Sequence, residues 1–322
     1  MDFRCRPRSR PLTVRRLLTH HVELQTRPTA AQRALLAGAN PCPPERAVLA
    51  ALPGDDPRTL VQLAEDHPAL GGAVDWPLLL DLLTPLRPRT YSISSAPATD
   101  PRHADLMVSV LDAPARGRSR PRPDGETRTG RGRYRGICSH HLASLRPGDT
   151  LYARVQPCRE AFRVDGSAPA VLIAAGTGLA PFRGAVADRL AAHRAGTGLP
   201  PALLYFGCDA PDADFLHAGE LRAAEAAGAV SLRPAFSAAP ENGAAFVQHR
   251  VAAEADEVWA LLSAGARVYV CGGGSRMAPG VREAFRTLYR ERTPDADATA
   301  AGRWLDTLMA DGRYVEDVYA AG

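Results

Sequence analysis

The sequence predicts an α/β fold whose C-terminal part is a parallel sheet and whose N-terminal part combines helices with antiparallel strands. Three patterns along the 322 residues carry this prediction. Apolar residues recur at helical spacing over residues 12–81, strand-like segments follow up to residue 155, and strands alternate with helices from residue 167 onward. Alternation at these lengths indicates βαβ units and therefore a parallel sheet.

The N-terminal region is expected to contain several short helices. Residues 14–18 and 59–64 carry apolar side chains at helical spacing. Prolines interrupt the pattern, so one long helix does not fit; they are Pro28, Pro41, Pro43, Pro44, Pro53 and Pro57.

The middle region is expected to form antiparallel strands over residues 90–95, 106–111 and 150–155, with prolines and glycines between them. Residues 115–136 hold many arginines among glycines and prolines. A site for nucleic acid would need interleaved aromatic side chains, and this stretch contains only Tyr134. We therefore expect a solvated loop and no nucleic-acid partner.

The C-terminal region is expected to begin near residues 165–167 and to consist of βαβ units. Its expected strands are residues 170–175, 202–206 and 267–271, and its expected helices are residues 181–193, 219–227 and 279–290.

The composition limits the classes of protein to which the chain can belong. Hydrophobic residues make up 45% and charged residues 23%, which is typical of globular proteins and excludes wholesale disorder. No apolar run approaches the ~20 residues that cross a bilayer, and we find no secretory signal, so a cytoplasmic protein without membrane insertion is expected. The six cysteines contain no C-x-x-C pair, which favours reduced thiols and no metal site. All 39 basic residues are arginine, so a Schiff-base lysine is excluded.

A glycine-rich turn joins the first strand of the parallel sheet to its helix. Gly176 and Gly178 let the backbone approach an anion closely, and Pro181 opens a helix whose first N–H groups attract phosphate. A tight turn without a ligand is the alternative. Two further strands end at Cys208 and Cys271, at the edge where open α/β sheets bind ligands, although each cysteine alone fits a small buried side chain equally well. Together these features predict a nucleotide-binding domain.

Short motifs occur in a fixed order along the chain. They are Val22-Glu-Leu-Gln, Cys42-Pro-Pro, Arg87-Pro-Arg-Thr-Tyr-Ser92, Gly136-Ile-Cys-Ser139, Gly176-Thr-Gly-Leu-Ala-Pro-Phe-Arg183, Tyr205-Phe-Gly-Cys208, Ala235-Phe-Ser237, Val247-Gln-His249, Cys271-Gly, Ser275-Arg-Met-Ala-Pro and Arg313-Tyr-Val-Glu-Asp-Val-Tyr319. In this order and spacing the chain resembles the diflavin reductases from about residue 13 to residue 322. The resemblance is closest to the C-terminal part of the reductase half of self-sufficient cytochrome P450–reductase fusions.

The resemblance implies three segments. Residues 13–85 would be the helical connecting insertion of an FAD domain, residues 86–166 a partial antiparallel β-barrel that binds FAD, and residues 167–322 a Rossmann-like domain that binds NAD(P). Because the resemblance begins at the insertion, we expect the FMN domain, any haem domain and the first barrel strands of the family to be absent from this chain.

On the flavin side, the resemblance implies that Arg89 binds the FAD pyrophosphate, that Tyr91 stacks on the isoalloxazine, and that Ser92 hydrogen-bonds near its reactive nitrogen. An ordinary edge strand is the alternative for these three residues. Further donors to the pyrophosphate would come from Gly136, Ile137, Cys138 and Ser139.

On the nicotinamide side, the resemblance implies a catalytic set of Ser92, Cys271 and Asp317, which would steer the hydride and stabilise charge on the ring. Tyr319 would cover the flavin and move aside for the nicotinamide, with a frayed C-terminal tail as the alternative. The dinucleotide itself would be held by Gly176, Thr177, Gly178, Pro181, Cys208, Asp209 and Ser237.

The chain departs from the family where the 2′-phosphate of NADPH is bound. Ala238 and Ala244 stand where the family has cations, and Asp209 reverses the sign of a third. Loss of two charge-assisted contacts reduces the preference for NADPH over NADH by roughly two to four factors of ten, since each factor of ten corresponds to about 1.4 kcal/mol. We therefore expect NADH to be used at least as well as NADPH. The alternative is that another residue holds the phosphate, and the candidates are Ser237, His249, Arg183, Arg222 and Arg250.

The expected function is that of a flavoprotein oxidoreductase, which takes hydride from NADPH or NADH onto FAD and passes single electrons onward. The expected acceptor is an FMN domain or a cytochrome P450 haem domain on another chain, or an artificial acceptor. Two other hypotheses remain open at this point. One is a truncated remnant that binds dinucleotide with little catalysis, and the other is an arginine-rich interaction protein that uses residues 116–135.

Overall fold

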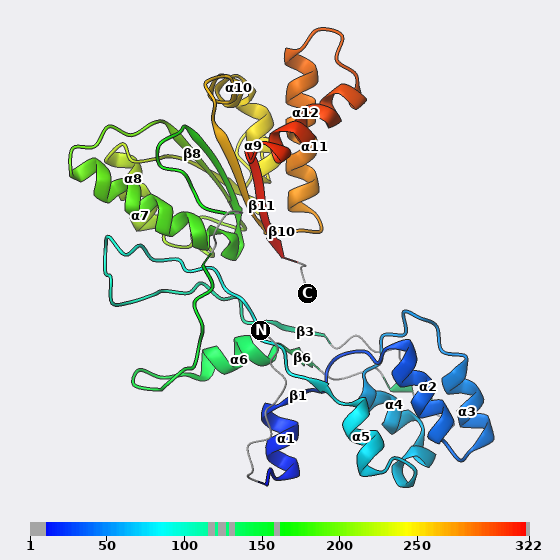
Figure 1. Cartoon of the computed structure of the whole chain (residues 1–322). Coiled ribbons are helices and arrows are strands. Elements are labelled where there is room, and N and C mark those ends of the chain that lie inside the picture. The colour runs from blue at the N-terminus through cyan, green and yellow to red at the C-terminus, as the bar shows by residue number, and fades with distance from the viewer. Residues whose placement is uncertain (1–10, 115–119, 122–126, 129–132, 158–161, 320–322) are drawn as a thin grey trace. The chain divides into compact units, whose positions relative to one another are not determined.

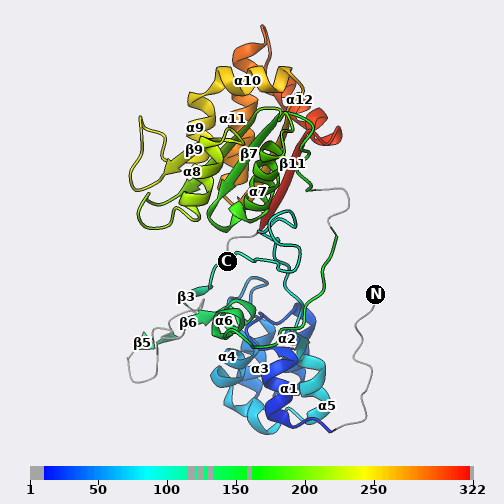
Figure 2. The same cartoon turned by 90° about the vertical axis from the view of Figure 1, so that its left-hand side faces the viewer.

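The computed structural model describes residues 11–114, 120–121, 127–128, 133–157 and 162–319 (Figures 1 and 2). It contains two compact units, and each is described here by itself. The first comprises Met1–Thr90 and Val110–Leu145, and the second comprises Tyr91–Ser109 and Arg146–Gly322. Cys5, Cys158 and several arginines of the expected loop, Arg116, Arg118, Arg122 and Arg131, lie outside the described residues.

The first unit contains the short helices that the sequence predicts. Thr29 and Thr59 each form a capping box with the glutamine three residues later, so that two helix-end N–H groups find acceptors at each site. Pro43 and Pro77 lie in the first turns of helices, where a missing N–H costs no hydrogen bond. The helices are α1 Val14–His20, α2 Ala30–Ala39, α3 Pro43–Ala50, α4 Leu60–Asp66, the 3₁₀ helix η1 Pro68–Gly72, α5 Trp76–Leu82 and α6 Ile137–Ser144.

A leucine core joins helices α2 to α5. Leu36, Leu49, Leu63, Leu70 and Leu82 are each almost completely buried in one cluster. Full burial of one such side chain is worth about 1.5–3 kcal/mol, so this cluster is the main source of stability for the helices around it.

The strands of the middle region are much shorter than the sequence predicts. Three antiparallel pairs form: β1 Val22–Glu23 with β2 Thr84–Pro85, β3 Asp112–Pro114 with β6 Arg133–Arg135, and β4 Arg120–Pro121 with β5 Thr127–Arg128. The continuous strands expected over residues 90–95, 106–111 and 150–155 were wrong, because these residues contribute only an isolated bridge between Ile93 and Leu106. Tyr152 is 94% exposed and Val155 is 72% exposed, so this extended segment has no neighbouring strand in the described part of the chain.

The second unit contains a five-stranded sheet, and the predicted parallel arrangement is confirmed (Figure 1). Its strands lie in the order β11-β10-β7-β8-β9 and every neighbouring pair is parallel. The strands are β7 Ala170–Ala175, β8 Ala202–Cys208, β9 Ser231–Phe236, β10 Arg267–Gly273 and β11 Tyr314–Tyr319.

Helices cover both faces of this sheet (Figure 2). On one face, Phe182 and Leu221 of the helices α7 Ala180–Arg194 and α8 Ala218–Ala226 pack against Leu172. The other face is covered by α9 Val247–Ala253, α10 Ala255–Ser263, α11 Met277–Arg292 and α12 Ala298–Ala310. A sheet buried on both faces needs apolar side chains at successive positions, which explains the continuous apolar run of β7.

The order of the strands reverses its direction at β7. The chain passes from β7 to β8 and β9 in one direction and then returns to β10 on the other side of β7. In open α/β sheets, ligands bind outside the carboxyl ends of the strands at such a reversal. The glycine turn after β7 lies at this point. Within the described ranges, no helix combines the length and the apolar character that crossing a bilayer demands.

Candidate functional site

The glycine turn after β7 is shaped for close approach to β10. Gly176 has φ +53°, a conformation that other residues rarely adopt. A Cβ atom on Gly178 would lie 2.1 Å from the carbonyl oxygen of Cys271, so only glycine fits between the turn and β10. Among the described residues, no side chain caps the following 3₁₀ helix, η2 Gly176–Leu179. The first N–H groups of η2 are therefore available to a phosphate. At the start of α7, by contrast, the N–H of Ala180 donates to the carbonyl oxygen of Thr177, and Pro181 has no N–H.

The three residues of the predicted catalytic set meet at the carboxyl edge of the sheet. Cys271 of β10 and Asp317 of β11 are register partners in neighbouring strands. The hydroxyl of Ser92, which belongs to the same unit, donates to Oδ2 of Asp317 at 3.4 Å. The structure thus brings together residues that are 225 positions apart in the sequence.

The two cysteines at this edge are buried neutral thiols. Burial, together with the carboxylate of Asp317, raises the pKa of the Cys271 thiol to about 12. Burial, together with Asp214 and Asp209, raises the pKa of Cys208 to about 12 as well. Both side chains therefore remain protonated near neutral pH, and Cys271 adds no negative charge beside Asp317.

Tyr319 lies over the glycine turn. It is the last residue of β11, its side chain is half-buried, and its hydroxyl lies 3.2 Å from Oγ1 of Thr177. Contact with the turn shows that this residue is docked in the structure, whereas its stacking on a flavin stays a prediction.

Asp209 and Ser237 lie side by side at the ends of two neighbouring strands. Asp209 follows β8, Ser237 follows β9, and the Ser237 hydroxyl donates to Oδ1 of Asp209 at 2.7 Å. Both predicted dinucleotide-binding residues are thus at the edge that carries the glycine turn.

In the first unit, Arg89 is held by an acidic residue that the sequence analysis did not single out. Nη2 of Arg89 donates to Oε2 of Glu23 at 3.1 Å, and Nη1 donates to the carbonyl oxygen of Arg87 at 2.5 Å. The Glu23 side chain is buried while that of Arg89 is 39% exposed. Glu23 therefore fixes one edge of the guanidinium and leaves part of it accessible to an anion.

The motif Gly136–Ser139 forms the start of α6 in this unit. Gly136 is the N-cap, and a Cβ atom there would lie 2.6 Å from Oγ of Ser139. The Ser139 hydroxyl accepts from the N–H of Leu111 and donates to the carbonyl oxygen of Gly136. The N–H of Gly136 donates to the carbonyl oxygen of Leu111 at 2.8 Å, so the expectation that Gly136 offers a donor was wrong. We expect Ile137, Cys138 and Ser139 to offer backbone N–H groups to a ligand.

Comparison with known proteins supplies the family. Residues 3–130 match the family described as FAD binding domain, and residues 172–283 match the family described as oxidoreductase NAD-binding domain. The chain is 35% and 36% identical, over 97% and 98% of its length, to two bifunctional cytochrome P450/NADPH–P450 reductases of Bacillus subtilis. It is 39% identical, over 75% of its length, to a self-sufficient cytochrome P450 monooxygenase of Oidiodendron maius.

The chain belongs to the diflavin reductase family. This confirms the resemblance found in the motifs and the prediction of an FAD- and NAD(P)-binding oxidoreductase. The chain spans 29% of the length of each of the two Bacillus relatives and 22% of that of the Oidiodendron relative.

A second residue whose contacts the sequence analysis did not predict is Arg183. Its Nη1 donates to Oδ2 of Asp105 at 2.8 Å and to the carbonyl oxygen of Ser94 at 3.2 Å. Its Nε and Nη2 donate to the two carboxylate oxygens of Glu220 in α8, and these bonds raise the pKa of Arg183. Arg183 therefore connects α7 and α8 to the segment that carries Tyr91 and Ser92. No local pattern reveals this role, because Asp105 is 78 positions away in the sequence.

We expect Arg183→Lys to slow flavin reduction by reduced dinucleotide about tenfold, since lysine keeps the charge but cannot make the forked contacts that hold residues 94 and 105. Affinity for the dinucleotide should change little. Rapid-mixing measurements of the reduction rate over a range of dinucleotide concentrations separate the two quantities. Arg194→Lys, at the exposed end of the same helix, is the matched control. An unchanged rate with only a lower melting temperature would show that Arg183 has a purely structural role.

Proposed function

We propose that this chain is a reductase module that passes hydride from NADPH or NADH to FAD and then releases single electrons to an acceptor. The observation that carries the proposal is the meeting of Ser92, Cys271 and Asp317 beside the glycine turn. A nicotinamide gains positive charge as it loses hydride. A carboxylate and a hydroxyl held at the edge that binds the dinucleotide are suited to stabilise that charge.

The residues present fit both cofactors. At the carboxyl edge of the sheet, the first residues of η2, among them the close-fitting Gly178, offer backbone N–H groups for the pyrophosphate of a dinucleotide. In the first unit, the partly exposed Arg89 and the start of α6, which no side chain caps, form a donor set for the diphosphate of FAD.

FAD, when bound, accepts the two electrons of a hydride and releases them one at a time. The protein supplies orientation and charge around it. Asp317 fixes the hydroxyl of Ser92, the protonated Cys271 avoids a second negative charge, and Tyr91 would stack on the isoalloxazine. The Tyr319 ring, which lies at Thr177, would move aside when the nicotinamide enters.

The electron acceptor belongs to the proposal as well. The names of the Bacillus relatives combine a cytochrome P450 and a P450 reductase in one protein, which supports a cytochrome P450 haem domain as acceptor. An FMN domain is the other acceptor that we propose. We also propose that residues 13–85 act as the connecting insertion, residues 86–166 as the flavin-binding portion and residues 167–322 as the dinucleotide-binding domain. The compartment that we propose for the protein is the cytoplasm.

Anaerobic mixing of the FAD-loaded protein with NADH or NADPH tests the proposed function. We expect the flavin absorbance to bleach on each addition and to return when ferricyanide is added as acceptor. Free FAD at the same concentration is the control. Binding of the dinucleotide without bleaching of the flavin would contradict the proposal and would favour a remnant that binds dinucleotide without catalysis.

A further inference from the structure

The connections that follow β8 and β9 carry negative charge and no arginine. Residues 209–217 contain Asp209, Asp212 and Asp214, and the only charged side chain of residues 237–246 is Glu241. Asp214 accepts from the N–H groups of Asp209 and Ala210, at 2.7 and 2.9 Å, and so shapes the first of these connections. Beyond the glycine turn, the carboxyl edge of the sheet, where we expect the nucleotide, is therefore acidic.

Asp209 presents its carboxylate in a fixed position. Cys208 and Phe236 are register partners, so the residues after them leave their strands together. Ser237 N–H donates to the carbonyl oxygen of Cys208 at 3.0 Å, and the N–H of Ala238 donates to that of Asp209 at 2.9 Å. Within the described part of the chain, the Asp209 side chain accepts one hydrogen bond, from Ser237 to Oδ1, which leaves Oδ2 for a ligand.

The position of Asp209 relative to the glycine turn matches that of a ribose-binding residue. In doubly wound sheets the pyrophosphate lies at the helix after the first strand, and an acidic residue at the end of the second strand accepts from the ribose hydroxyls of NAD, whereas NADP sites have an arginine nearby. Here β7 leads into the glycine turn, and its parallel neighbour β8 ends immediately before Asp209.

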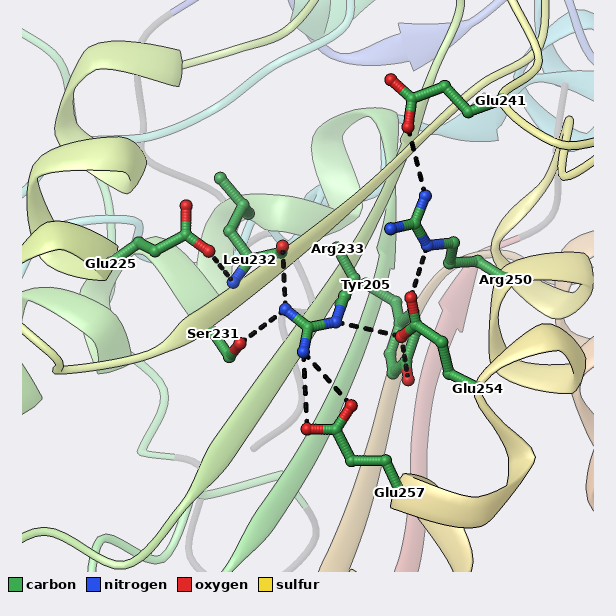
Figure 3. Close-up of polar contacts among 9 residues, drawn as sticks. All are labelled: Tyr205, Glu225, Ser231, Leu232, Arg233, Glu241, Arg250, Glu254 and Glu257. Carbon is green, nitrogen blue, oxygen red and sulfur yellow. Dashed lines mark hydrogen bonds and ion pairs between the residues drawn. The ribbon is translucent and has the colours of Figure 1, made fainter.

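The arginines that could serve a 2′-phosphate instead are engaged by other groups. Arg183 binds Glu220 and Asp105, and the guanidinium of Arg222 lies 5.3 Å from the centre of the Phe215 ring. Figure 3 shows Arg250 between two carboxylates, with Nε 2.6 Å from Glu254 and Nη1 3.3 Å from Glu241.

The same network engages the nearby Arg233. As Figure 3 shows, its guanidinium contacts Glu254 and Glu257, and Tyr205 donates to Glu254 from the sheet. Arg250 and Arg233 thus share Glu254, so recruiting Arg250 to a phosphate would leave this carboxylate, whose side chain is only 20% exposed, with one partner fewer.

We propose that Asp209 makes this a site for NADH, by accepting hydrogen bonds from the adenosine ribose hydroxyls and by repelling a 2′-phosphate. The proposal rests on the proposed function and names its substrate. A phosphate monoester carries close to two negative charges at pH 7, so the carboxylate of Asp209 would repel it, whereas the same carboxylate accepts a hydrogen bond from a ribose hydroxyl.

Calorimetric titration with 5′-AMP and with 2′,5′-ADP, which differ only by the 2′-phosphate, tests the proposal without turnover. We expect 5′-AMP to bind at least tenfold more tightly, a difference of about 1.4 kcal/mol. Asp209→Asn should reduce this ratio severalfold, because it removes the repulsion but keeps the size of the side chain. Asp212→Asn, exposed in the same connection, should leave the ratio within twofold.

A gain-of-function variant makes the test independent of damage to the fold. Ala238 is exposed beside Ser237, and Ala238→Arg should raise the affinity for 2′,5′-ADP about tenfold while that for 5′-AMP changes little. The rates of flavin reduction by NADH and by NADPH should change in the same direction as the affinities for the corresponding nucleotides. Tighter binding of 2′,5′-ADP by the unaltered protein, or an unchanged ratio in Asp209→Asn, would overturn the assignment but leave the proposed function standing. Failure to bind either nucleotide would overturn both.

Discussion

Replacing Asp317 with alanine is expected to slow flavin reduction by the dinucleotide on the order of a hundredfold, the usual cost of removing one group that stabilises charge in a transition state. We propose two roles for Asp317 at this edge of the sheet. Its carboxylate would stabilise the positive charge that develops on a nicotinamide, and it holds the hydroxyl of Ser92. Alanine removes both the charge and the hydrogen-bond acceptor.

The reduction rate at saturating dinucleotide, followed by flavin absorbance after anaerobic mixing, is the quantity to measure. Asp317→Asn keeps an acceptor for Ser92 and loses only the charge, so its rate should lie between those of the alanine variant and the unaltered protein. Asp311→Asn, at the exposed end of α12, is the control for a surface charge. If both Asp317 variants reduced the flavin at the original rate, the charge of Asp317 would have no part in hydride transfer.

The same substitution changes the thiol beside it in a known direction. Burial is the larger cause of the high pKa of Cys271 and the Asp317 carboxylate is the smaller. Asp317→Ala should therefore lower that pKa, yet leave the thiol protonated near neutral pH. A loss of activity in the variant thus reports on the carboxylate rather than on ionisation of the cysteine.

The parallel sheet was predictable because its strands carry the local signals of burial on both faces. The run that forms β7 is continuously apolar, and the glycine turn after it marks both the end of the strand and the phosphate-binding start of a helix. The predicted strands and helices of this region agree with the observed ones to within two residues at each end. The largest differences are at β8 and β10, which extend two residues further than predicted, to Cys208 and Gly273, and at α11, which is two residues longer at each end.

The remaining features depend on contacts between distant parts of the chain. Residues 150–155 alternate like a strand, yet a strand also needs a neighbour, and Tyr152 and Val155 are exposed here. The ion pair of Arg89 with Glu23 spans 66 positions, and that of Arg183 with Asp105 spans 78. Motif resemblance identified Arg89 and Arg183 but gave no information on which carboxylates hold them.

Gly178→Ala is expected to lower the affinity for the dinucleotide at least a hundredfold and to destabilise the second unit. The added methyl group would lie 2.1 Å from the carbonyl oxygen of Cys271 and 2.9 Å from Cα of Gly272. These are backbone atoms of a central strand, so they cannot rotate away, and the turn must shift from β10 instead. Overpacking of this kind costs about 1–3 kcal/mol of stability. Displacing the N–H groups that would bind the pyrophosphate removes charge-assisted hydrogen bonds worth about 1.5–3 kcal/mol each.

Two other glycines separate this steric effect from general effects of alanine. Gly198→Ala, with open space around its Cα, should change neither the melting temperature nor the affinity for 5′-ADP. Gly176→Asn tests backbone conformation alone, because φ is +53° there, nothing lies within 4 Å of an added Cβ, and asparagine tolerates positive φ. The Gly176→Asn variant should lose much less affinity for 5′-ADP than the Gly178→Ala variant. If Gly178→Ala bound 5′-ADP and NADH as tightly as the unaltered protein, the turn after β7 would not be the pyrophosphate site, because no dinucleotide could bind there without sensing a displaced turn.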